Sequence, residues 1–166
     1  RKVLQLNLLP VYLKQLRGDL LAAVKSGVSI SLVWPVFCAM LRLQCVTLAL
    51  RLKAMVGKAR GSMSFLRDAA GIATDYYKLL SLIAVGHMWV KMAQTAGQRL
   101  ATNPEGRGFY ETKIKTCRFY MRKLMPKTRA LAGTIWGGAD VLMEIPAEQF
   151  GHAQTNIGTQ ATTGTK

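Results

Sequence analysis

Acidic residues are scarce in this chain. Its 166 residues include 8 Asp and Glu against 23 Lys and Arg, which gives a formal net charge of +15. Residues 1–60 contain a single acid, Asp19, among ten basic residues. A surface of this kind attracts polyanions at low salt without any specific site. Charge alone therefore identifies no partner.

Cysteines are few and odd in number. Cys38, Cys45 and Cys117 form no Cys-x-x-Cys pair and no cluster with His. This argues against a disulfide framework or a zinc site. We predict buried thiols in a reducing compartment, and a cytoplasmic location.

The common catalytic motifs are also missing. The sequence has no Gly-rich phosphate loop, no HExxH, no paired Cys ligands and no GxSxG elbow. No catalytic, cofactor-binding or metal-binding residue is predicted, and the chain is not expected to be an enzyme on its own. Because it begins at Arg1 without a signal-like segment, we interpret it as part of a longer protein.

Residues 26–41 carry no charge, which raises the question of a membrane span. The run is shorter than the roughly 20 residues that a span needs. It also contains Pro35 and is followed directly by Arg42. We predict no transmembrane span.

Helical periodicity dominates the rest of the chain, and no segment shows a clear strand pattern. We predict an all-α fold, an antiparallel bundle of about four long helices over residues 1–150. Residues 151–166 have too little apolar surface to offset chain entropy and are predicted to form a disordered polar tail. The expected helices are 10–25, 35–57, 65–100 and one beginning near 109, with a loop at 102–108.

Three apolar stripes define the expected core. The first helix should bury its apolar face, which consists of Leu13, Leu16, Leu20, Leu21 and Val24. The third carries small residues that permit close helix approach, on the stripe Ile72, Tyr76, Leu79, Ile83, Gly86, Val90, Ala93 and Gly97. The last has the stripe Tyr110, Ile114, Cys117, Met121, Leu124, Thr128, Leu131 and Ile135.

Pro126 interrupts that last stripe. It removes a backbone donor and crowds the preceding turn, so the helix should kink or divide there. The flanks and back of this helix are strongly basic, with Lys113, Lys115, Arg118, Arg122, Lys123, Lys127 and Arg129.

Isolated polar residues offer weak candidates for chemistry. His87 lies in an apolar helix with no carboxylate nearby in sequence, so a satisfied core or pocket-edge histidine is favoured over a base or ligand. His152 lies in the polar tail and carries no weight. Asp75 and Tyr76 suggest a polar contact, although a turn facing solvent is favoured. Glu111, Glu144 and Glu148 are expected on solvated surfaces.

Aromatic residues could be core or stacking platforms for single-stranded nucleic acid. The aromatics at 76, 89 and 136 lie on or beside the apolar stripes, which favours the core. The remaining candidates are Trp34, Tyr77, Phe119 and Tyr120.

Two segments, taken together, resemble a known domain. They are AAGIATDYYKLLSLIAVGHMWVKMAQTA at 69–96 and FYETKIKTCRFYMRKLMPKTRALAGTIWGGADVLMEIPAEQF at 109–150. They are similar to the C-terminal helical domain of bacterial acyl-CoA dehydrogenases, in the branch that includes 3-methylmercaptopropionyl-CoA dehydrogenase-like enzymes. Residues 1–63 match less closely, through either divergence or a reading error in the sequence.

The resemblance implies a parent flavoenzyme. In that family a glutamate removes the α-proton of an acyl-CoA, FAD accepts the β-hydride, and an electron-transfer flavoprotein reoxidises the flavin. The residues for these steps lie upstream, so none is assigned to this chain and no FAD is expected in it. The implied role is an accessory or oligomerisation module that contacts the rest of the dehydrogenase and its other subunits. A basic module for anionic membrane surfaces or nucleic acid is the alternative.

Overall fold

A computed structural model describes residues 8–59, 64–102 and 106–139, without the side chains of residues 64–68. These residues form α1 (Leu8–Lys25), α2 (Ile30–Ala59), α3 (Ser64–Thr102), α4 (Arg107–Lys123) and α5 (Lys127–Gly137). No strand occurs in the described part of the chain. The predicted all-α bundle of about four long helices is confirmed, with the fourth divided into α4 and α5. The predicted disordered tail lies outside the described residues.

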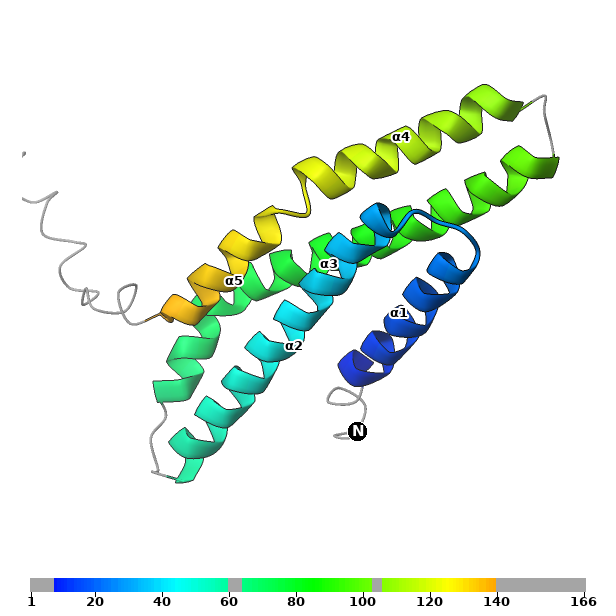
Figure 1. Ribbon diagram of the computed structural model, residues 1–166. Coiled ribbons are helices and arrows are strands. Elements are labelled where there is room, and N and C mark those ends of the chain that lie inside the picture. The colour runs from blue at the N-terminus through cyan, green and yellow to red at the C-terminus, as the bar shows by residue number, and fades with distance from the viewer. Residues whose placement is uncertain (1–7, 60–63, 103–105, 140–166) are drawn as a thin grey trace, which may run out of the picture.

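The helix α3 is the centre of the bundle. It contacts each of the other four helices. Figure 1 shows α2 and α5 beside its first half and α4 beside its second half. The apolar stripe of α3 faces these neighbours, with Leu79 and Ile83 fully buried. Gly86 lies where Met125 and Val36 approach most closely, because a Cβ there would be 3.0 Å from Met125 Sδ.

The break predicted at Pro126 is present. Lys127 N donates to Leu124 O and Thr128 N donates to Met125 O, both at 3.1 Å, so a tight turn replaces the α-helical ladder. Thr128 is fully buried, and its hydroxyl donates to Met125 O at 2.7 Å. The chain therefore changes direction at Pro126 while the same side stays in the core.

The α1–α2 connection ends as its sequence suggests. Gly27 adopts φ +87°, a left-handed conformation that costs glycine little, and Val28 N donates back to Ala23 O at 3.1 Å. However, α2 begins at Ile30 rather than at Pro35. Pro35 is tolerated in the second turn because Leu32, Val33 and Val36 around it are buried.

Several predicted core positions are wrong. Leu21 and Val24 are exposed, because the buried face of α1 runs through Leu13, Leu16, Leu20 and Ala23. Gly97 is exposed and has open space around it, whereas its neighbour Ala96 is buried. Among the thiols, Cys117 is buried as predicted but Cys45 is exposed and Cys38 only half-buried. A one-residue shift around a helix, about 100°, is enough to produce each error.

Candidate functional site

A polar cluster joins α1 to α3. His87 is 2% exposed, and its Nε2 lies 2.9 Å from Asp19 Oδ2. Lys91 Nζ donates to the same oxygen at 3.2 Å. His87 is thus in the core, as predicted. Its partner was missed, because Asp19 is 68 residues away along the chain. One sequence feature could have identified this partner: Asp19 is the only acid of residues 1–60 and lies on an amphipathic helix.

The electrostatics of this cluster favour a charged carboxylate. Partial burial opposes the charge of Asp19, but hydrogen bonds and charges from Lys91 and His87 outweigh it and hold the pKa of Asp19 below its usual value. Beside it, burial raises the pKa of Tyr12, and the negative charge of Asp19 adds to the effect. The rings of Tyr12 and His87 meet edge to face with centroids 6.1 Å apart.

A histidine paired with an aspartate can act as a base only if a nucleophile or substrate reaches its second nitrogen. His87 Nδ1 is buried and has no hydrogen-bond partner among the described residues. The Tyr12 hydroxyl oxygen is also buried and has no hydrogen-bond partner among the described residues. The cluster therefore fastens α1 to α3 and has none of the geometry of an acyl-transfer site.

The other acidic candidates are surface residues where they can be placed. Arg107 Nε donates to Glu111 Oε1 at 2.8 Å, and this hydrogen bond lowers the pKa of Glu111. A lowered pKa is the opposite of what a general base near neutral pH needs. Asp75 forms a 3.8 Å ion pair with Lys78 on the same helix. Glu144, Glu148 and His152 lie outside the described residues.

Tyr76 makes the polar contact that was the less favoured interpretation, and the prediction that it faces solvent is wrong for this residue. The Thr47 hydroxyl donates to Leu43 O at 2.7 Å, so its oxygen accepts from the Tyr76 hydroxyl, 2.8 Å away. Tyr120 is buried, and its hydroxyl donates to Leu82 O at 3.0 Å. These two hydroxyls join α3 to its neighbours.

The prediction for the aromatics is partly wrong. Tyr76 and Trp89 are half-buried against the core, as expected. Trp136, however, is 57% exposed. Trp34, Tyr77 and Phe119 are also more than half exposed. The stripe of α5 runs through Thr128, Ala132 and Ile135, so Trp136 lies one position beyond it.

Many of the exposed apolar side chains of the described residues lie on the outer side of α2. Exposed or half-buried residues repeat there at alternating steps of four and three, the spacing of a coiled-coil seam. We call this set the α2 seam: Trp34, Cys38, Leu41, Cys45, Leu48, Leu52 and Met55. Arg42 and Arg51 flank it, and α2 contains no acidic residue. The seam was missed because the sequence of α2 is apolar nearly all round.

The α2 helix is also the one helix of the described chain that is long and apolar enough to cross a membrane. By itself this finding is weak, since a core helix passes the same test. Its inner side, which includes Val36, Met40 and Leu43, is buried in the bundle. The prediction of no span stays a prediction.

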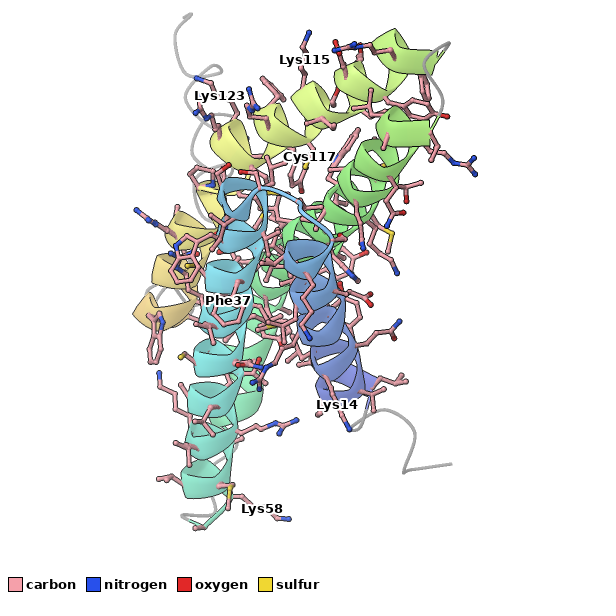
Figure 2. All side chains as sticks on the ribbon, turned by 45° about the vertical axis from the view of Figure 1, so that its right-hand side comes forward. Lys14, Phe37, Lys58, Lys115, Cys117 and Lys123 are labelled. Carbon is pink, nitrogen blue, oxygen red and sulfur yellow. The ribbon has the colours of Figure 1, made fainter. Side chains whose placement is uncertain are left out.

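The predicted basic face of α4 is present. Arg118, Arg122 and Lys123 are exposed, and Lys113 lies over the ring of Phe109 at 5.0 Å. Figure 2 shows Lys115 and Lys123 projecting from the outer side of α4, while Cys117 points inward. Arg118, Arg122 and Lys123 lie along one helix and form a ridge, whereas Lys113 lines a hollow of about 420 Å³ together with Lys91 of α3.

The described residues do not cluster into a metal site. They contain no group of three or more His, Cys, Asp or Glu side chains that could hold a metal. One hollow among them has a volume of about 610 Å³ and is lined by the sides of α2 and α3.

Comparison with known proteins gives one family. Residues 29–146 match the family described as "Acetyl-CoA dehydrogenase C-terminal like". The match begins at the turn before α2 and includes residues 29–63, where the resemblance in sequence is weaker. No curated protein matches the chain.

Proposed function

Because the chain belongs to the acetyl-CoA dehydrogenase C-terminal-like family, we propose that it is the C-terminal accessory and oligomerisation module of an FAD-dependent acyl-CoA dehydrogenase. The family match carries this proposal. The parent enzyme would perform α,β-dehydrogenation of an acyl-CoA in the cytoplasm, with FAD held upstream and reoxidised by an electron-transfer flavoprotein. The resemblance of residues 69–96 and 109–150 favours the branch of 3-methylmercaptopropionyl-CoA dehydrogenase-like enzymes.

The α2 seam supports an accessory role. A run of exposed apolar side chains on one helix is a typical docking surface, since burying it removes apolar area from water. At about 1.5 Å per residue, positions 34–55 extend for roughly 30 Å. Arg42 and Arg51 on its flanks suit a partner surface with acidic flanks. We assign this surface to the rest of the dehydrogenase or to another subunit.

The double substitution Leu48→Glu and Leu52→Glu in the complete dehydrogenase tests this role. Both side chains are more than half exposed, so the bundle should still fold. We expect subunit or domain association to weaken, measured by analytical ultracentrifugation, with flavin content retained. Leu21→Glu is the matched control, because Leu21 is equally exposed but lies on α1, outside the matched family region. An unchanged assembly in the double variant would refute the role of the seam.

Binding to an anionic membrane surface is the alternative, because the apolar seam lies beside basic residues. Cosedimentation of the complete enzyme with anionic and neutral vesicles distinguishes membrane binding from association with the dehydrogenase or another subunit. Loss of vesicle binding in the double variant with an unchanged oligomer would favour the membrane.

A further inference from the structure

Two hollows adjoin on α2. One lies between α2 and α3, with a volume of about 610 Å³, and is lined by apolar residues that include Leu50, Ala54 and Ile72. The other lies between α1 and α2, with a volume of about 350 Å³. Thr47 and Arg51, one helical turn apart, line both. The hollows therefore adjoin at these two residues, and we call the pair of hollows the α2 cleft.

The larger hollow suits a hydrocarbon chain. Its polar groups at Thr47 and Tyr76 already bond to each other, and the Thr47 hydroxyl hydrogen is used by Leu43 O. An apolar chain laid over them would leave no donor hydrogen unmet. The lining residues of α3 run from Ala69 to Leu80, about 16 Å at 1.5 Å per residue. Small side chains line both of its walls, with Ala54 on α2 and Ala69 and Ala73 on α3.

The smaller hollow suits an anion. Lys14 and Arg17 of α1 line it together with Arg51 of α2, and none of its lining residues is acidic. All three cations are exposed, and none forms an ion pair with an acid among the residues whose side chains are described. Lys53 adds a fourth positive charge at the edge of the larger hollow. These cations come from two helices and face one space, unlike the ridge on α4.

We propose that the α2 cleft binds a single-chain anionic amphiphile. The hydrocarbon tail lies between α2 and α3, and a carboxylate or phosphate head lies among Lys14, Arg17 and Arg51. A cleft of this size falls in the range typical of small-ligand sites, about 300–1,000 Å³. The hollows are bounded by helices on two sides, which favours one monomeric ligand over a lipid surface. The argument for this site does not use the proposed accessory role, although Leu48 of the α2 seam and Arg51 on its flank also line the smaller hollow.

Amphiphiles with one tail and different heads test the proposal directly. Dodecanoate, dodecyl phosphate, dodecanol and dodecyltrimethylammonium are titrated into the full chain by calorimetry, below their micelle concentrations. We expect the two anions to bind with one site per chain and the neutral and cationic probes to bind at least about tenfold more weakly. Equal binding of all four probes would overturn the anionic head site. Binding to anionic vesicles without binding of the monomeric anions would assign the cleft to a membrane surface and also overturn the proposal.

Two variants locate the site. Arg51→Gln should weaken both anions about tenfold, since it removes the cation shared by the two hollows. Arg99→Gln is the matched control, because Arg99 is an exposed arginine on α3 that lines neither hollow. Ala73→Leu should weaken dodecanoate by filling the tail groove without changing charge. Circular dichroism verifies folding, and if both folded variants bind like the wild type, the ligand is not in the α2 cleft.

Discussion

Gly86 is the position at which a single added side chain should perturb the bundle most clearly. It lies on α3 against α2 and the α4–α5 turn, and a Cβ there would be 3.0 Å from Met125 Sδ and 3.3 Å from Val36 Cγ2. The first contact is with the end of a flexible side chain, which can move. The second is with a stiff β-branched residue that is itself fully buried.

These contacts determine whether a substitution at Gly86 raises or lowers the free energy of unfolding. In Gly86→Ala, the gain from replacing a mid-helix glycine is about 1 kcal/mol. The required shifts of a few tenths of an ångström offset it, so the free energy of unfolding should change little. In Gly86→Leu, three further carbon atoms must enter a packed region, and overpacking typically costs about 1 to 3 kcal/mol. For a chain of this size, that loss corresponds to a Tm lower by roughly 2 to 12 °C.

Thermal unfolding followed by far-UV circular dichroism measures both variants. The matched control is Gly97 on the same helix, which has nothing within 4 Å of its Cβ position. Gly97→Leu should leave the Tm unchanged or raised, and Gly97→Ala should raise the free energy of unfolding by up to about 1 kcal/mol. If Gly86→Leu and Gly97→Leu behave alike, the close packing at Gly86 is refuted.

Three further outcomes are expected. Folding lowers the pKa of Asp19 from its ordinary value of 3.8. Asp19→Asn should therefore lower the free energy of unfolding above about pH 4, and the difference from the wild type should vanish as pH falls through the folded pKa. Urea unfolding between pH 3 and 7 measures this difference, and a difference that persists at low pH would contradict the ion pair. Exposed Cys45 should react first with a thiol reagent, and Cys117, whose burial raises its pKa to about 11, should react only on unfolding; equal rates would show that Cys117 is accessible. In the complete dehydrogenase, Arg118→Ala with Arg122→Ala should weaken association with little change in KM for acyl-CoA, and a large rise in KM with an intact oligomer would mean that these arginines serve the ligand.

The fold was largely predictable because its signals are local. The steps of four and three from Ile72 to Ala93 identify α3, and Gly27 and Pro126 mark a helix end and a break through backbone chemistry that acts within a few residues. The face of α1 was harder to assign. Leu20, Leu21, Ala23 and Val24 offer two overlapping stripes, and only the position of α3 decides which one is buried.

The features that bear on function depend on contacts between distant residues. Asp19 and His87 lie in contact because α1 packs on α3, and the sequence around each residue does not indicate that the other is its partner. The α2 seam has regular spacing, but α2 is apolar nearly all round, so its sequence does not distinguish the exposed side from the buried side. The positions of the neighbouring helices determine which side is buried. The α2 cleft joins Lys14 to Ile72 across three helices, so no sequence window contains it.

The position of α2 in the chain has a consequence for synthesis. During translation α2 emerges from the ribosome before α3, and α3 supplies much of the surface that covers its inner side. At roughly 5–20 residues per second, the 39 residues of α3 take about 2 to 8 seconds to follow. Throughout that interval α2 presents apolar side chains on both its inner side and its seam. The nascent chain therefore offers chaperones and membrane-targeting factors a helix far more apolar than the one that the finished bundle displays.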